Sequence, residues 1–232
     1  SEAEATDELW HEIRNAYRTR RILTGTLDGI EQTTGGKTLA TVSFRGFRIA
    51  IPIREMLVLD ERMPSGRAYA DYMNRLNRIL GTMLGAEIDF IVKGIDSTTH
   101  SAVASRREAM LRKRQTFYFG KDVSGNPYIY PGRLVEARVI AVAEKVLRVE
   151  AFGIECAIFA RDLSWQWVSD VRDLYSVGDR VLVRVQEISG EDVEHLSIRA
   201  DIRSTFSETS VDNLKKCQVQ SKYAGKVTDL RG

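Results

Sequence analysis

A short basic run between residues 106 and 114 is the densest group of side chains in this sequence that could do chemistry. Arginine and lysine occupy five of its positions, within an apolar pattern typical of a helix: Arg106, Arg107, Arg112, Lys113 and Arg114. Guanidinium and ammonium groups at this density can bind phosphates. A charge run on a helix is more often its solvated face, so both interpretations stay open at this stage.

Residue types that support catalysis or metal binding are scattered. His11, His100 and His195 lie far apart, with no serine, cysteine or carboxylate spacing that would make a triad or a metal site. Cys156 and Cys217 have no CxxC or Cys/His spacing, which indicates a reducing compartment and argues against a structural metal. We therefore expect no enzyme activity, no metal and no cofactor.

Two tryptophans, Trp165 and Trp167, lie close together after a predicted strand. A large aromatic side chain at such a place can close the bottom of a hydrophobic core or can stack on a flat ligand. We expect at least one of them to cover the core, with a stacking role for Trp165 as the alternative.

The overall charge limits how the chain could bind an anionic partner. The 232 residues contain 34 Lys and Arg against 32 Asp and Glu, for a formal charge of +2, so any basic surface must be local. No apolar stretch approaches the length of a membrane span, and the segment Ser1 to Asp7 is acidic rather than signal-like. We expect a cytoplasmic protein that makes no membrane contact.

The elements that must position these residues repeat along the chain. Residues 23–27, 135–139 and 223–227 begin alike, with apolar residues at alternate positions, which predicts a strand with one buried face. The first two copies then continue with the same predicted strands: second strands 39–44 and 146–151, third strands 47–53 and 154–160, fourth strands after Gly85 and Gly178, and fifth strands around Ser105 with Arg107 and Ser197 with Arg199. Five short antiparallel strands with a connector after the third match the partly open OB barrel.

Helical spacing of apolar residues predicts additions to these barrels. Leu9, Trp10, Ile13 and Tyr17 precede the first barrel, and a second stripe lies between its third and fourth strands: Tyr69, Met73, Leu76, Leu80 and Met83. We expect a mainly β fold of two five-stranded antiparallel OB barrels in tandem with the start of a third. The predicted divisions are an N-terminal helix (1–21), a first domain (22–105), a basic helix and linker (106–131), a second domain (132–205), and a linker with the first strand of a truncated third domain (206–232).

The third copy stops at Gly232, soon after its first strand. A lone strand lacks the neighbours that satisfy its backbone hydrogen bonds. We therefore expect residues 206–232 to be poorly anchored and the natural protein to continue beyond them.

Short sequence motifs within the repeats, called phrases below, resemble those of a known family. In the second copy they occur in this order: Gly153-Ile154-Glu155, Asp162-Leu163-Ser164, residues 175–179 and residues 196–199. The first copy has weaker counterparts in Ile51-Pro52, Glu55-Met56 and residues 104–110. These phrases resemble the S-one family of OB-fold RNA-binding domains, named for the largest protein of the bacterial small ribosomal subunit.

The resemblance implies binding without catalysis. Members of the family lay single-stranded RNA across strands two and three, where aromatic side chains stack on bases and basic residues follow the phosphates. It also implies the ribosome or ribosomal proteins as further partners and a link to translation.

The sequence departs from the family on this surface. The family typically has two Phe around the second strand, a His in the third, an Asp ending the fourth and an Arg near the fifth. In the second copy these positions fall at Lys145, Arg148, Phe159, Ser189 and Val193. In the first copy, where stacking capacity is lost, they fall at Thr38, Thr41, Pro52, Asp96 and His100.

Strand alternation predicts which of these residues face outward. Arg148 lies between Leu147 and Val149, and Phe159 follows Ile158, so Arg148 and Phe159 should both lie on the outer face. The residues that we expect to contact RNA are Lys145, Arg148, Phe159, Arg161, Arg199, Arg106 and Arg107.

Three functions fit this sequence. The first is single-stranded RNA binding, mainly by the second domain, with the first domain in a positioning role. The second is a protein–protein docking module, for example one attached to the ribosome, with little RNA affinity. The third is the substrate-handling arm of a larger nuclease, which only the shared fold favours.

Overall fold

The structure, a computed structural model, describes residues 1–59 and 62–206. The chain divides into two compact units, and the boundary between Met110 and Leu111 lies within helix α3 (Arg106–Arg114). We call residues 1–110 unit 1 and the residues from 111 onward unit 2. The predicted third domain lies outside the described residues.

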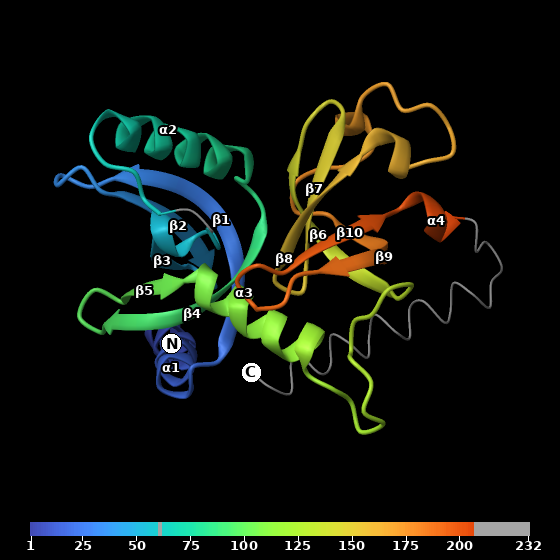
Figure 1. The fold of residues 1–232 in the computed structure, drawn as a ribbon. Coiled ribbons are helices and arrows are strands. Elements are labelled where there is room, and N and C mark those ends of the chain that lie inside the picture. Colours follow the sequence, from blue (N-terminus) through green and yellow to red (C-terminus); the bar gives the residue numbers. More distant parts are fainter. Residues whose placement is uncertain (60–61, 207–232) are drawn as a thin grey trace. The chain divides into compact units, whose positions relative to one another are not determined.

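Unit 1 is a closed five-stranded barrel with helices outside it (Figure 1). Its elements are α1 (Glu2–Thr19), β1 (Ile22–Gln32), β2 (Thr38–Phe44), β3 (Phe47–Pro52), the 3-10 turn η1 (Ile53–Glu55), α2 (Arg67–Thr82), β4 (Glu87–Asp96) and β5 (Ser101–Ser105). The strand order is β1-β2-β3-β5-β4, and all neighbours are antiparallel except β3 and β5. This parallel contact closes the barrel and leaves no free sheet edge, a feature that the all-antiparallel prediction lacked.

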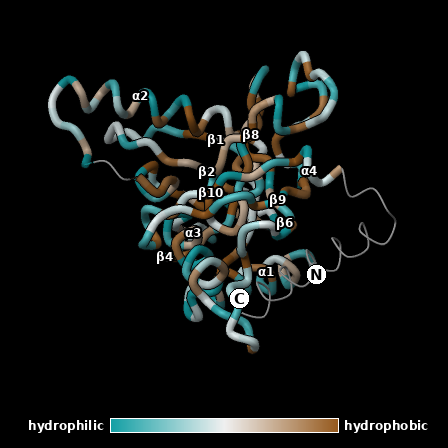
Figure 2. The backbone as a smooth tube through the Cα atoms, turned by 45° about the vertical axis from the view of Figure 1, so that its right-hand side comes forward, coloured by the Kyte–Doolittle hydropathy of each residue, from teal (hydrophilic) through white to brown (hydrophobic). Residues whose placement is uncertain are grey.

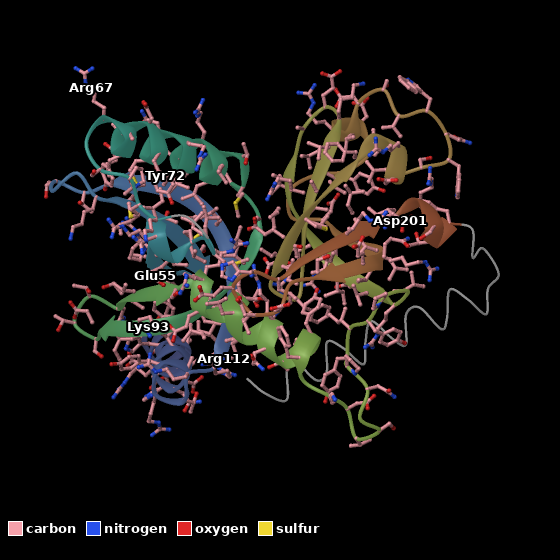
Figure 3. The ribbon with its side chains drawn as sticks, viewed as in Figure 1. Glu55, Arg67, Tyr72, Lys93, Arg112 and Asp201 are labelled. Atoms are coloured by element: carbon pink, nitrogen blue, oxygen red, sulfur yellow. The ribbon has the colours of Figure 1, made fainter. Side chains whose placement is uncertain are left out.

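The core of unit 1 combines alternate strand residues with one face of each helix. Ala40 and Val42 on β2 and Ile49 and Ile51 on β3 are fully buried. From α2 the buried residues are Tyr72, Leu76 and Leu80, at helical spacing. Figure 2 shows hydrophobic and hydrophilic segments alternating along α2, and Figure 3 shows Tyr72 directed toward the barrel and Arg67 away from it. Tyr69, which we placed on the buried stripe, is instead 41% exposed.

Unit 2 repeats the order of strands. Its elements are the π-helix η2 (Gln115–Phe119), β6 (Leu134–Val142), β7 (Val146–Ala151), β8 (Ile154–Phe159), the 3-10 turns η3 (Ala160–Asp162) and η4 (Val171–Asp173), β9 (Arg180–Ser189), β10 (Ser197–Asp201) and α4 (Arg203–Phe206). The sheet order is β10-β9-β6-β7-β8 with antiparallel neighbours throughout. The predicted class, mainly β with two five-stranded OB-type barrels and helical additions, is confirmed.

The segment that we predicted as a linker packs on unit 2. Phe117, Tyr118 and Ile129 are buried in the second hydrophobic core. The Tyr118 hydroxyl donates to the Ala151 carbonyl at 2.7 Å, and the Ile129 amide donates to the Phe117 carbonyl at 3.0 Å. Its aromatic and aliphatic side chains bury apolar area, so this segment adds to the core rather than only connecting the barrels.

The turn after the fifth strand is similar in both units. Strand β5 ends at Ser105, two residues earlier than predicted, and the Ser105 hydroxyl accepts a hydrogen bond from the Glu108 amide at 3.0 Å. In unit 2 the Asp201 carboxylate accepts one from the Ser204 amide at 2.9 Å. Each side chain caps the start of a helix, α3 or α4. None of the helices in the described part of the chain is both long and apolar enough to cross a membrane.

Candidate nucleic-acid interface

The outer face of the β7–β8 hairpin carries the predicted aromatic and basic residues. The strands pair Val146 with Phe159 and Arg148 with Ala157, so Arg148 and Phe159 are diagonal neighbours. Leu147 and Ile158 point into the core, and Phe159 is 51% exposed. The predicted orientation of Arg148 and Phe159 is confirmed.

Arg148 is held by an acidic neighbour that sequence reasoning missed. One of its terminal nitrogens, Nη2, lies 3.1 Å from Glu155 Oε2 on β8. The Arg148 side chain is 45% exposed and that of Glu155 is 15% exposed, so the guanidinium still faces solvent while its acidic partner is largely covered.

Lys145 directly precedes β7, and Arg161 follows two residues after the last residue of β8, Phe159. Because Val146 pairs with Phe159, both basic residues lie near Phe159 in the chain fold. The Ala160 amide donates to the Lys145 carbonyl at 3.0 Å. The Arg161 side chain is 81% exposed, and its guanidinium carbon is 5.9 Å from the centre of the Phe159 ring. A cation beside an exposed ring can hold the phosphate of a nucleotide whose base stacks on that ring. The structure thus brings Lys145, Phe159 and Arg161 together.

Two more aromatic residues lie in the connector after β8, and neither covers the core. Trp165 is 65% exposed and Trp167 is 87% exposed. The expectation that one of them closes the barrel was wrong, because the smaller Leu163 and Val171 fill that place. The two cations beside them are Arg203, 4.2 Å from the Trp165 ring centre, and Lys145, 5.7 Å from that of Trp167. Arg203 was not singled out from the sequence, because it lies outside the motifs that resemble the family.

Acidic side chains border this surface. Asp170 accepts hydrogen bonds from the Arg172 side chain and backbone amide, and these bonds, with the positive charges of Arg172 and Lys145, lower the pKa of Asp170 to about 2. Glu144 Oε1 lies 3.6 Å from Lys145 Nζ. Acidic and basic groups therefore lie side by side at this edge of the surface, in keeping with the balanced composition.

Two arginines of the basic run in α3 donate hydrogen bonds to the protein's own backbone. Arg106 is fully buried and its Nη1 donates to the Met56 carbonyl at 2.7 Å. Arg114, 5% exposed, donates to the carbonyls of Gly153 and Val193 at 2.7 and 3.0 Å. Buried guanidinium groups satisfy polar backbone atoms here, so Arg106 cannot contact RNA in this conformation, and Arg106 and Arg114 do not form a solvated face.

Two further predicted residues lie on elements other than the β7–β8 hairpin. Arg199, on β10, lies 3.5 Å from Glu187 Oε2 on β9. Arg107 follows Arg106 in α3 and belongs to unit 1. An RNA contact by Arg199 or Arg107 stays a prediction.

The corresponding face of unit 1 is different in chemistry. It holds a shallow polar groove of about 340 Å³ lined by Asp28, Gly29, Glu31, Thr41, Ser43, Gly46, Phe47 and Arg48. The Thr41 hydroxyl donates to Asp28 at 3.0 Å, and Glu31 is paired with Arg48. Two carboxylates and a buried Phe47 make this groove a poor platform for nucleotides.

Within the part of the chain that the structure describes, histidines and acidic residues are scattered. The described residues contain no group of three or more His, Cys, Asp or Glu side chains that could hold a metal ion. His100 instead stacks on Trp10, with ring centres 5.0 Å apart, and His195 contacts Asp192 at 2.7 Å.

Comparisons with known proteins match most of unit 2 to a known family. The S1 RNA binding domain family matches residues 129–198, which lie in unit 2. The chain is 22% identical over 223 residues to the small ribosomal subunit protein bS1 of Coxiella burnetii, which covers 96% of this chain and 35% of that protein. The chain thus spans about a third of the length of this curated relative.

Two solved structures show weaker similarity. One is an a/eIF2alpha-aDim2p-rRNA complex from Pyrococcus horikoshii, with 20% identity and a TM-score of 0.33, covering 40% of this chain and 52% of that one. The other is a multidomain protein with nucleic acid binding domains from Streptococcus pneumoniae, with 10% identity and a TM-score of 0.30, covering 78% of this chain and 50% of that one. The resemblance stated from the sequence is confirmed by the family match and the curated relative: residues 129–198 match the S1 RNA binding domain family, within a chain similar to ribosomal protein bS1.

Proposed function

We propose that this chain binds single-stranded RNA in a process linked to translation, with unit 2 as the main contacting part. The observation that carries the proposal is the exposed Phe159 ring on the β7–β8 face, flanked by Lys145 and Arg161, inside the segment that matches the S1 family. The relation to ribosomal protein bS1 supports the link to translation and a ribosomal partner.

The proposed chemistry is binding without bond breaking. A base stacks on Phe159, and Lys145, Arg148 and Arg161 neutralise neighbouring phosphates. Because every base has a π-face and every nucleotide carries a charge, this arrangement tolerates many sequences. A cytoplasmic location fits this role and stays a prediction.

Unit 1 has a positioning role in this proposal. Its groove contains Asp28 and Glu31, whose charges repel phosphate, and its exposed aromatic Tyr69 lies on α2 rather than on the strands. The same groove favours the second candidate, a docking module that contacts a protein and has little RNA affinity.

Salt dependence separates these two functions. We expect parent protein to bind fluorescent single-stranded RNA with an affinity that falls steeply as salt rises, because phosphate contacts release counterions. A docking module would show weak binding at every salt concentration. The same titration with single-stranded DNA measures any preference for RNA.

Two variants test the face itself. Phe159→Ala should weaken RNA binding about tenfold or more, since stacking on one ring contributes about 1–3 kcal/mol. The matched control is Tyr69→Ala, which removes an exposed aromatic side chain from unit 1 and should leave RNA affinity unchanged.

Arg148→Ala should lower the slope of log affinity against log salt by about 0.7, the value for one phosphate contact on a single strand. Arg180→Ala is its control, because Arg180 also forms an ion pair between strands of unit 2, with Glu136 at 3.5 Å. If Phe159→Ala and Arg148→Ala fold normally and bind as the parent does, this face is not the site and the docking function takes the lead.

A further inference from the structure

We propose that the connector between Leu163 and Val171 extends the RNA site of unit 2 with two more stacking positions, Trp165 and Trp167. This inference rests on the proposed function and goes beyond it, because it places bases outside the β7–β8 face and predicts a longer binding site.

The exposure of the two tryptophans is the first observation. Within the same connector, Leu163 and Val171 are buried and Val168 packs against the core, while the larger Trp165 and Trp167 stay 65% and 87% exposed. Burial of a tryptophan would remove more apolar area from water than burial of a valine. Large apolar side chains left outside while small ones are buried mark a surface that binds something.

The connector is anchored, so its exposed rings are held in place. The Val171 amide donates to the Glu144 carbonyl at 2.8 Å, and Lys145 Nζ donates to the Ser169 carbonyl at 2.8 Å. At the other end, the Leu163 amide donates to the Ala160 carbonyl at 3.2 Å. These bonds join the connector to the ends of β7 and β8, beside Phe159.

A cation accompanies each of the three exposed rings. Arg161 lies beside Phe159, Arg203 lies 4.2 Å from the centre of the Trp165 ring, and Lys145 lies 5.7 Å from that of Trp167. Arg203 Nη1 also donates to the Arg161 carbonyl at 3.2 Å, which links the first two pairs.

Paired rings and cations identify the ligand as a strand of unpaired nucleotides. Each nucleotide offers one flat base and one phosphate, so a strand with splayed bases can satisfy a ring and a cation at each step. In a duplex the bases are stacked inside and their faces cannot reach the rings. An apolar peptide would use the rings and gain nothing from the cation beside each of them.

Oligonucleotide length gives the test, carried out on the full chain with fluorescein-labelled oligouridines of about four and about twelve nucleotides, within the site sizes known for OB folds. Trp165→Ala and Trp167→Ala should each weaken binding of the longer strand about tenfold, and the double variant should bind both lengths about equally. Leu174→Ala, which removes an exposed apolar residue from the same region, should change nothing.

Tryptophan fluorescence provides a second readout. Binding of the longer strand should quench most of the emission, because Trp165 and Trp167 are exposed while Trp10 is buried in unit 1. The double variant Trp165→Phe and Trp167→Phe should keep much of the affinity that the double alanine variant loses, because a phenylalanine ring can also stack on a base.

The outcomes separate this inference from the proposed function. If the parent protein binds no RNA at low salt, the proposed function fails and this inference fails with it. If the parent binds, Phe159→Ala weakens binding, and the double alanine variant binds the longer strand as the parent does, the inference alone is overturned. Unquenched emission on binding would overturn it as well.

Discussion

Cys156 lies on β8, inside the barrel beneath the proposed RNA face. Burial raises the pKa of its thiol from 9.0 to about 12, partly offset by the positive charge of Arg148. The folded state thus disfavours the thiolate. The stability that the neutral thiol contributes is present in full below pH 9 and is lost as pH rises from about 9 toward 12.

Cys156 should therefore resist alkylation while the protein is folded. In a Cys217→Ala background, iodoacetamide at pH 9 should leave native protein unmodified and should modify it fully in denaturant, because the thiolate is the reactive form. Mass spectrometry measures the fraction of Cys156 that is modified under native and denaturing conditions. Rapid modification of the native protein would show that β8 opens to solvent, which would contradict a rigid RNA face.

At the residue scale, alternation in the sequence was enough to orient the strands' side chains. It placed Arg148 and Phe159 outside because their neighbours Leu147 and Ile158 are apolar. It could not foresee that Arg106 is buried, since that depends on the Met56 carbonyl, fifty positions away, which accepts its guanidinium. The exposure of Trp167 could not be predicted either, because tryptophan occurs both in protein cores and on surfaces.

At the element scale, the serine at the end of β5 has two partners. Ser105 is 1% exposed; its hydroxyl accepts from the Glu108 amide at the start of α3 and donates to Glu55, which ends η1. It therefore joins the fifth strand, the helix that follows it and the turn after the third strand.

Ser105→Ala should destabilise the protein by about 1–2 kcal/mol, because loss of an N-cap side chain typically costs that much. Ser101→Ala, on the same strand but less buried, should stay within about 0.5 kcal/mol of the parent. Urea denaturation followed by circular dichroism measures both. Equal stabilities for the two variants would mean that the cap contributes nothing.

Element types followed from period and composition, and the exceptions depend on contacts between residues distant in sequence. Strict period two predicted the fourth strands, and helical spacing predicted α1 and α2. The π-helix Gln115–Phe119 was missed because its residues show neither period, and Phe117 and Tyr118 are buried by contacts with the barrel core. The parallel pairing of β3 with β5 depends on barrel closure, which no local pattern encodes.

At the scale of the whole molecule, the repeat was the signal that predicted two barrels. A series of strand motifs that occurs twice in the same order predicts the same fold twice, even where the outer faces of the two barrels differ. The proposed difference in function between the units depends on their outer faces, where Phe159 in unit 2 corresponds in position to Pro52 in unit 1. Both barrels share the core pattern, and only unit 2 has an aromatic ring at this position.

Each unit has its own core, so matched core variants should separate the roles of the two barrels. Ile51 in unit 1 and Ile158 in unit 2 occupy equivalent strand positions and are 0% and 1% exposed. Replacing either by alanine should destabilise its own unit by about 2–5 kcal/mol.

Ile51→Ala should lower the melting temperature reported by the buried Trp10 and leave RNA affinity at 25 °C within about twofold of the parent, a change of less than 0.5 kcal/mol. Ile158→Ala should lower the temperature at which RNA binding is lost, because Phe159 is its neighbour on β8. If alanine prevents either variant from folding, Ile51→Val and Ile158→Val, at about 0.5–1.5 kcal/mol each, allow the same comparison. Equal losses of RNA affinity from both sites would show that unit 1 contacts RNA directly, and the division of roles between the barrels would be wrong.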